Sequence, residues 1–211
     1  MKTKLICALA VMLLCLPLTA RSQELRGKIE RSIKDLQEEF SQIPENKVLL
    51  LDQLASRMAA NMDKKNFTVI FVDQANDEMG QLAMIWLRTG LIYYNLNDNF
   101  NIESAGIETS NEPLNLSALA DHGFKIKNDK NNEFIIQTIK YGSGHWEINR
   151  KNLNALNLNE DNSIKVYVKE GLTERNAEIL FDDREAIAAE MLYVAAQVNA
   201  IVKTKNEQPI K

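Results

Sequence analysis

Apolar residues follow two different spacings in the first third of the chain. Between residues 25 and 43 they recur every three or four positions with charged residues between them, which predicts an amphipathic helix. Pro44 ends this pattern, and a second helical pattern runs to Met62. A continuous run of apolar and β-branched residues then occupies positions 67–72, which is typical of a strand buried on both faces of a parallel sheet.

The rest of the chain alternates between shorter patterns of both kinds. A polar stretch at 73–78 leads into a helical pattern that reaches Tyr94, and strand, loop and helix in this order open a βαβ unit. A long closing helix is expected to begin near Asp182 and Asp183, whose carboxylates suit a helix N-terminus. Between them the sequence predicts a short helix at 114–122, a polar loop at 142–162, and strands at 101–106, 124–127, 134–139 and 165–168.

The first residues have the composition of an export signal. Lys2 and Lys4 precede an apolar run at 5–18, which small and polar residues follow. We therefore predict a signal peptide at 1–22 and an exported chain, periplasmic or secreted. The run is shorter than the roughly 20 residues of a spanning helix, so no membrane attachment is expected after cleavage. Both cysteines, Cys7 and Cys15, lie inside it. The mature chain would then have no disulfide, no thiolate metal site and no cysteine nucleophile.

Charge and histidine content exclude two further classes of function. The formal net charge of −4 becomes −6 when Lys2 and Lys4 leave with the signal, and −7 if Arg21 leaves too, so the positive field that nucleic-acid binding needs is missing. Two histidines cannot form a three-histidine metal site. His122, which precedes a glycine, fits a helix end, while Ser143 and His145 fit a flexible turn better than a nucleophile with its base.

Four segments of the chain resemble low-molecular-weight protein-tyrosine phosphatases and the related arsenate reductases. Residues 71–87, FVDQANDEMGQLAMIWL, are similar to the first strand, phosphate-binding loop and first helix of this family. Residues 103–108 (ESAGIE) resemble its second strand, residues 115–126 (NLSALADHGFKI) its next helix and turn, and residues 189–194 (AEMLYV) its closing helix.

The resemblance implies an α/β fold and a division of the chain. The expected architecture is a three-layer sandwich in which a small, mostly parallel sheet is flanked by helices, formed by a phosphatase-like domain at 66–204. An N-terminal helical pair at 23–65 precedes this domain, and a fraying tail at 205–211 follows it.

The segment that matches the phosphate-binding loop lacks the residues that the chemistry requires. The family's loop is a cysteine, five residues and an arginine, usually followed by a serine, and its backbone N–H groups surround an oxyanion at a helix N-terminus. Asp73 stands in place of the cysteine, Met79 in place of the arginine and Gly80 in place of the serine, whereas Asn76 matches. The degenerate loop, called the acidic loop below, consists of Asp73, Gln74, Ala75, Asn76, Asp77, Glu78, Met79 and Gly80.

Charge argues against an oxyanion in the acidic loop. Asp73, Asp77 and Glu78 place three carboxylates within six residues, and at an effective dielectric of ~20 each would repel a phosphate by about 2–3 kcal/mol at ~6 Å. The N-terminus of a helix offers only about 0.3–1 kcal/mol. The family's general acid, an aspartate before a proline, also has no counterpart at 165–173. We therefore expect a non-catalytic, exported binding or structural protein, a pseudo-phosphatase without a cofactor.

The acidic loop and the N-terminal helices also allow other interpretations. The same three carboxylates could hold Ca²⁺ or Mg²⁺ and support a metal-assisted hydrolase, or they could form a solvated loop at a helix start. Met79 could close the former anion cavity as an apolar plug. The helical pair could pack on its own domain, form a homodimer face or cover the site, and an acidic surface would suit a basic protein partner.

Overall fold

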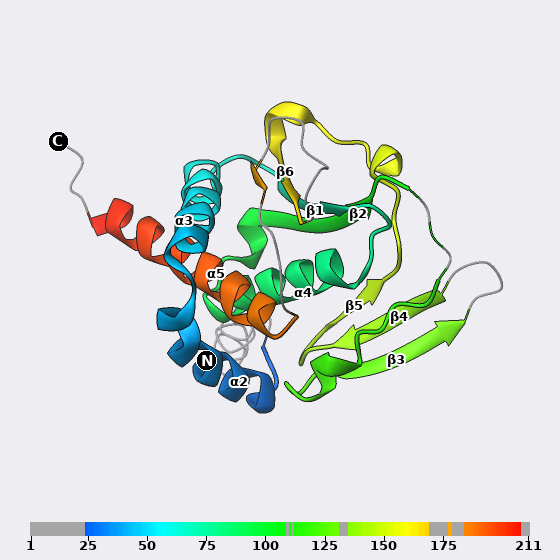
Figure 1. Cartoon of the computed structure of the whole chain (residues 1–211). Helices are drawn as coiled ribbons and strands as arrows, with labels where there is room; N and C mark the ends of the chain where they lie inside the picture. Colours follow the sequence, from blue (N-terminus) through cyan, green and yellow to red (C-terminus); the bar gives the residue numbers. More distant parts are fainter. Residues whose placement is uncertain are drawn as a thin grey trace, which may run out of the picture.

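A computed structural model describes residues 24–108, 110, 112–130, 135–168, 177–178 and 184–207 (Figure 1). The predicted signal peptide at 1–22, Asp182, Asp183 and residues 208–211 therefore lie outside the described residues, as does most of the segment 165–173.

Both predicted N-terminal helices are present. Helix α2 (Gly27–Glu38) continues into a 3₁₀ turn, Glu39–Gln42, and α3 (Glu45–Ala60) begins directly after Pro44. Proline has no N–H group, and an N–H group at this position would find no partner within the helix. Pro44 is therefore well suited to precede the first turn of α3. The apolar residues at helical spacing face inward, and those fully buried include Ile29, Ile33, Leu51, Leu54 and Met58.

A parallel sheet forms the centre of the chain's α/β part. Strands β1 (Phe67–Asp73), β2 (Phe100–Gly106), β6 (Ser163–Tyr167) and β7 (Ala177–Glu178) lie in the order β2-β1-β6-β7. All three pairings are parallel, with Phe67 opposite Phe100 and Asp73 opposite Gly106. The predicted α/β class, with a small parallel sheet flanked by helices, is confirmed.

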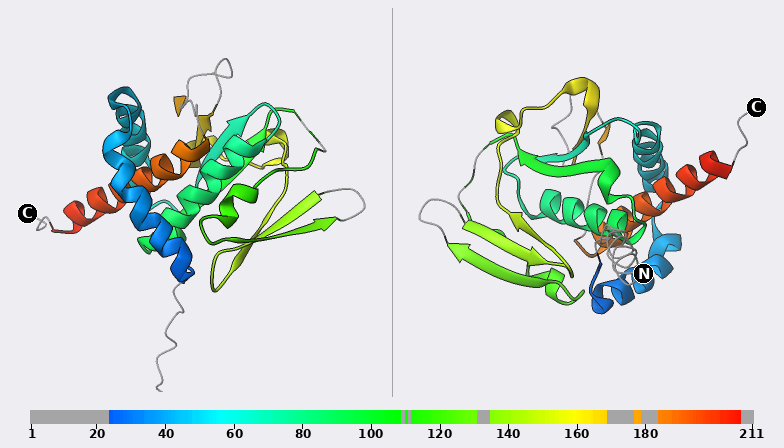
Figure 2. Two further views of the ribbon diagram at one scale, coloured as in Figure 1. Left: turned by 60° about the horizontal axis from the view of Figure 1, so that its bottom comes forward. Right: turned by 180° about the vertical axis from the view of Figure 1, so that it is seen from behind.

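Helix α4 (Glu78–Tyr93) lies between the other layers. It buries 12 of its 16 residues, as expected for a helix that is apolar around its whole circumference. Figures 1 and 2 show α4 beside the parallel sheet, with α5 (Arg184–Glu207) along one side and a second sheet on the other. α5 is the one described helix long and apolar enough to span a membrane, but its apolar residues Ile187, Met191, Val194 and Val198 are fully buried in the core.

Among the described residues, the two faces of the parallel sheet are covered unequally. One face of β1 belongs to the large core, which also contains residues of all four long helices. The β1 residues on this face are Phe67, Val69 and Phe71. Ile70 and Val72 point to the other face, where a smaller cluster is completed by half-buried leucines of the segment 149–162. These leucines are Leu153, Leu156 and Leu158.

A second, antiparallel sheet corrects part of the sequence-based prediction. Strands β3 (Lys125–Lys130), β4 (Ile135–Lys140) and β5 (His145–Ile148) pair in this order, apart from the parallel sheet. The prediction of loop throughout 142–162 was wrong for β5, because four residues carry too little pattern without their partner strand. The helix predicted at 114–122 is a 3₁₀ turn, Ser117–Ala120, followed by Gly123 at φ 100°.

Candidate functional site

The acidic loop joins the C-terminal end of β1, next to the sheet's centre, to the N-terminus of α4. This is the edge at which open α/β sheets bind ligands. Asn76 adopts the left-handed conformation expected of it, with φ 50°, and its Nδ2 donates to the Ser104 carbonyl oxygen at 3.3 Å. Gly106 lies against the backbone of Ala75 and Asn76, where no Cβ would fit. The loop is therefore held tightly against the end of β2.

The carboxylate of Asp73 lies inside the acidic loop and accepts hydrogen bonds from the loop's own backbone. Its Oδ1 accepts from the N–H of Ala75 and of Asp77, both at 3.0 Å, and its Oδ2 lies 3.1 Å from the same Asp77 nitrogen. The side chain is fully buried. The Asp73 side chain is therefore not solvated, because its carboxylate accepts the backbone N–H groups that point toward the inside of the turn.

Gly80 makes room for this arrangement. A Cβ atom at position 80 would lie 2.7 Å from Asp73 Oδ2, which is closer than nonbonded carbon and oxygen atoms approach. Gly80 and the inward-turned Asp73 therefore depend on each other sterically. Met79, which the sequence analysis considered as an apolar plug, is half-buried and packs against the large core.

Burial and a neighbouring carboxylate raise the pKa of Asp73 to about 6. The largest cause is loss of hydration, followed by the charge of Asp77, and a side-chain hydrogen bond with Asp77 also raises the pKa, while the N–H donors of Asp77 and Ala75 lower it. Asp73 therefore changes its protonation state near neutral pH, unlike an exposed aspartate.

The other two acidic side chains have different partners. Asp77 is the N-cap of α4 and accepts from the N–H of Met79 at 3.3 Å. Glu78 lies 2.6 Å from Nη2 of Arg184. Burial raises the pKa of Glu78, and the charge of Arg184 opposes this effect. Within the described ranges no three His, Cys, Asp or Glu side chains are grouped to hold a metal ion. The Ca²⁺ or Mg²⁺ site suggested for Asp73, Asp77 and Glu78 stays a prediction.

Arg150 holds the acidic loop from its carbonyl side and was missed by the sequence analysis. Its Nη1 donates to the carbonyl oxygens of Ala75 at 2.7 Å and Asn76 at 3.1 Å, and its Nε donates to the Glu112 carbonyl at 2.9 Å. The only available signal was that Arg150 and Lys151 are the sole basic residues between 142 and 162. The loop is thus fixed on both sides, with Asp73 binding its N–H groups and Arg150 its carbonyl groups.

No known protein family matches this sequence, and no curated protein is similar to it. Among solved structures, the chain is similar to a thioredoxin-dependent arsenate reductase of Corynebacterium glutamicum, with 14% identity and a TM-score of 0.37, over 97% of this chain and 100% of that one. A likeness at this level assigns no role to any residue, so the chemistry of the loop must be judged from its own atoms.

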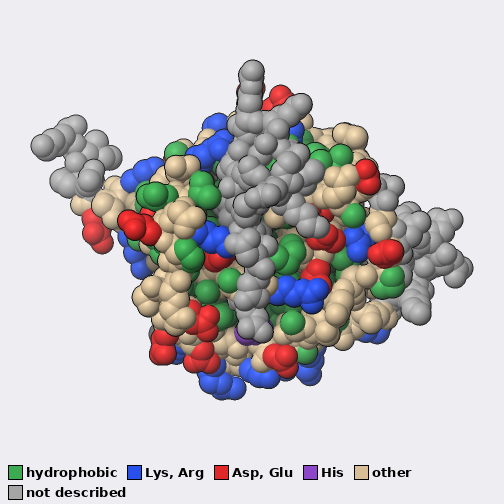
Figure 3. All heavy atoms as spheres, in the orientation of Figure 1, with side chains coloured by type: hydrophobic (Ala, Val, Ile, Leu, Met, Phe, Trp, Pro, Cys, Tyr) green, Lys and Arg blue, Asp and Glu red, His purple; other side chains and the backbone are tan. Residues whose placement is uncertain are grey.

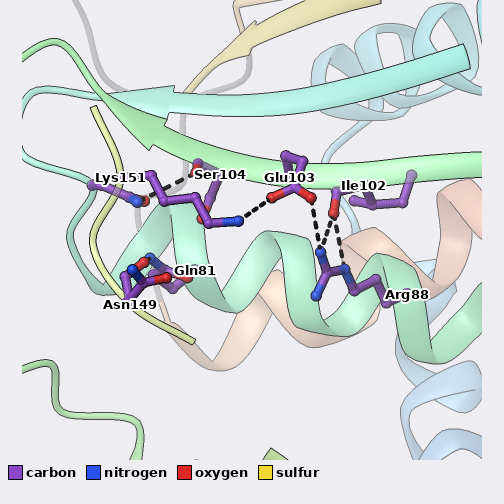
Figure 4. Close-up of polar contacts among 8 residues, drawn as sticks. Gln81, Arg88, Ile102, Glu103, Ser104, Asn149 and Lys151 are labelled. Atoms are coloured by element: carbon purple, nitrogen blue, oxygen red, sulfur yellow. Dashed lines mark hydrogen bonds and ion pairs between the residues drawn. The ribbon is translucent and has the colours of Figure 1, made fainter. Parts of the chain in front are cut away.

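A second polar cluster, again missed by the sequence analysis, extends along α4 from Gln81 to Arg88 (Figure 4). Glu103 of β2 is 2.6 Å from Lys151 Nζ and 3.6 Å from Arg88 Nη2. Nε and Nη2 of Arg88 also donate to the Ile102 carbonyl oxygen. Gln81 of α4 donates to the Asn149 carbonyl at 3.1 Å. These contacts join α4, β2 and the segment after β5 into one rigid framework.

The remaining residues singled out from the sequence serve the fold. The His122 ring lies edge-on to Trp86, with centroids 4.9 Å apart, and burial lowers the pKa of His122. Oγ of Ser143 accepts from the Glu24 N–H at 3.0 Å, whereas His145 is exposed on β5. The described contacts of Ser143 and His145 therefore do not include the pairing that a nucleophile and its base require.

Proposed function

We propose that this chain is an exported, non-catalytic protein with a phosphatase-like loop, acting as a binding or structural module. The observation that carries the proposal is the position of the Asp73 carboxylate, which accepts the N–H groups of Ala75 and Asp77. In an oxyanion-binding loop such groups are the ligand's donors. Here the carboxylate of Asp73, which is part of the chain itself, already accepts these N–H groups.

The balance of electrostatic repulsion and attraction at the acidic loop supports the proposal. A phosphate entering the loop would meet the Asp73 carboxylate, and two unit charges ~4 Å apart repel by about 4 kcal/mol at an effective dielectric of ~20. The favourable interaction of an anion with the N-terminus of α4 contributes at most ~2 kcal/mol. The loop also has neither a thiol nor an arginine of its own, and the loss of a nucleophile alone costs on the order of 10⁶ in rate.

The first test is turnover by the chain that begins at residue 23. We expect no hydrolysis of p-nitrophenyl phosphate, and no binding of phosphate or arsenate by calorimetry, in buffer alone or with Mg²⁺, Ca²⁺ or Mn²⁺. Hydrolysis that requires a cation and disappears in Asp73→Asn would instead establish the alternative, a metal-assisted hydrolase that uses Asp73, Asp77 and Glu78.

A second test removes the internal anion. Asp73→Ala leaves the N–H groups of Ala75 and Asp77 in place without their acceptor, so we expect millimolar formate or phosphate to raise the melting temperature of this variant. The same salts should leave the unaltered chain unchanged, and chloride at equal ionic strength should affect neither protein. Equal stabilisation of both proteins by phosphate would mean that Asp73 does not occupy the oxyanion position.

The surface of the described residues indicates where a homodimer could form. On the face drawn in Figure 3, acidic and basic side chains are interspersed between polar and apolar ones. Among the described residues, Leu49 of α3 and Ile107 are the exposed large hydrophobic side chains. A homodimer through the N-terminal helices would therefore use Leu49 as its apolar anchor, and sedimentation of the Leu49→Glu variant tests this proposal.

A further inference from the structure

A cavity of about 240 Å³ opens near the far end of α4 from the acidic loop. Ten residues separate Glu78 from Arg88, which corresponds to about 15 Å along a helix. The residues that line the cavity come from the C-terminal half of α4, the 3₁₀ turn Asn97–Asn99, the start of β2, and β5. The lining includes three kinds of side chain: apolar ones, amides, and the pair of Arg88 and Trp146. The apolar side chains include Leu91, Ile92 and Phe100, and the amides are Asn97 and Asn101.

Arg88 brings a largely buried positive charge to this cavity. Its side chain is 19% exposed, and its guanidinium carbon lies 5.7 Å from the centre of the Trp146 ring. Two of its nitrogens, Nε and Nη2, donate to the Ile102 carbonyl oxygen. The third nitrogen has no hydrogen bond among the described contacts, and Figure 4 shows it pointing away from both Ile102 and Glu103.

The carboxylate nearest to Arg88 compensates this charge incompletely. Glu103 directs one oxygen to Lys151 Nζ at 2.6 Å, while its other oxygen remains 3.6 Å from Arg88 Nη2. That distance is beyond a normal hydrogen bond. Asp98 also borders the cavity, but it is exposed to solvent and accepts the Asn97 amide at 2.7 Å. Burial lowers the pKa of Arg88, although a guanidinium remains charged in proteins.

We propose that this cavity binds a small monocarboxylate with an aromatic or branched aliphatic body. The carboxylate would accept from the third nitrogen of Arg88 and from the Asn101 amide, while the body would lie against Leu91, Phe100 and Trp146. A buried guanidinium with a donor to spare is the group that carboxylates prefer. The volume is just below the roughly 300 Å³ at which drug-sized pockets begin, so the ligand is small. This inference is independent of the acidic loop and of whether it is catalytic.

The experiment uses phenylacetate as the probe and the chain from residue 23. We expect saturable binding by calorimetry, with ¹H–¹⁵N NMR shifts at Arg88, Asn101 and the Trp146 indole. The neutral isostere phenylacetamide should bind at least tenfold more weakly, because a hydrogen bond to a charged group contributes about 1.5–3 kcal/mol. Equal affinities for the acid and the amide, or no saturable binding of either, would overturn the proposal.

Two exposed asparagines provide matched variants that leave the core intact. Asn101→Asp places a negative charge at the mouth of the cavity and should weaken phenylacetate binding at least fivefold. Asn154→Asp makes the same change of net charge on the segment 149–162 and should leave the affinity within twofold. Equal effects of both variants would contradict binding in this cavity.

The C-terminal residue of a peptide offers the same carboxylate chemistry, so two further probes distinguish the sources. N-acetylglycylphenylalanine that binds at least tenfold more tightly than phenylacetate, and loses this advantage when amidated, identifies a peptide C-terminus as the ligand. Weaker binding of the peptide identifies a free small acid. Arg88→Met, checked for folding by its melting temperature, should abolish the preference for acid over amide in either case.

Discussion

The Asp73 side chain determines the character of the acidic loop. Sequence alone indicated that aspartate replaces a nucleophile and that three neighbouring carboxylates would repel an anion. It did not indicate that Asp73 turns inward and binds the N–H groups of Ala75 and Asp77. Side-chain direction at a loop depends on the backbone dihedrals, which the left-handed Asn76 and the close approach of Gly106 set here.

The replacement Asp73→Asn should stabilise the protein at neutral pH. The pKa of Asp73 is raised from 3.8 to about 6 in the folded state, so folding favours the protonated carboxyl. The contribution of this group to stability is therefore greatest at low pH and is lost as pH rises from about 4 to above 6. Asparagine retains an oxygen acceptor without the charge. We expect the free energy of unfolding to rise by about 1–3 kcal/mol at pH 7.5, with little gain at pH 4, as measured by urea titration. A loss of stability at pH 7.5 would contradict this assignment.

Gly80 and Gly27 should respond in opposite directions to replacement by alanine. A Cβ at position 80 meets Asp73 Oδ2, whereas a Cβ at position 27 has no neighbour within 4 Å. Gly80→Ala should cost about 1–3 kcal/mol through overpacking, and Gly27→Ala, in the first turn of α2, should stabilise by up to about 1 kcal/mol. In the Asp73→Ala background the cost of Gly80→Ala should largely disappear, a coupling that a double-mutant cycle measures.

At the scale of elements, the segments with a regular spacing of apolar residues formed the helices and the strand that this spacing predicts. The apolar run at 67–72 became β1, and the helical spacings became α2, α3 and α4. The predictions failed where a short segment depends on a distant partner: β5 exists because β4 pairs with it, Ile139 opposite Trp146. Arg150 was missed for the same reason, since 74 or 75 residues separate it from the two loop carbonyls that it binds.

Replacement of Arg150 by methionine should loosen the acidic loop. The change removes the donors to the Ala75 and Asn76 carbonyls, and hydrogen bonds from a charged group contribute about 1.5–3 kcal/mol each. We expect amide hydrogen exchange at 74–80 to accelerate at least tenfold, while exchange in α5 changes only in proportion to global stability. Arg31→Met, on the exposed face of α2, is the control and should leave the loop's exchange rates unchanged.

At the scale of the whole molecule, the N-terminal helices belong to the same core as the α/β part. α2 and α3 pack against α5, and their apolar residues join those of α4 and β1 in one cluster. Lys47 of α3 also lies 2.8 Å from Glu190 of α5, which is nearly fully buried. The sequence predicted two helices before the sheet, but their docking depends on α5, which lies more than a hundred residues away.

Two leucines of α3 test how far this shared core extends. Leu54 is fully buried and Leu49 is 60% exposed. Leu54→Ala should lower the free energy of unfolding of the whole chain by about 2–5 kcal/mol, in a single transition seen by both circular dichroism and Trp fluorescence. Leu49→Ala should change it by less than about 0.5 kcal/mol. Separate transitions for the two probes would mean that the helical pair unfolds independently.

In the part of the chain that the structure describes, the cover over Ile70 and Val72 has a consequence for the acidic loop. The strip of chain that shields Ile70 and Val72 with three leucines also supplies Arg150. The side chains that cover Ile70 and Val72 and the guanidinium that binds the loop carbonyls therefore come from one segment of the chain. A change in the packing of the three leucines is therefore expected to alter the order of the acidic loop as well.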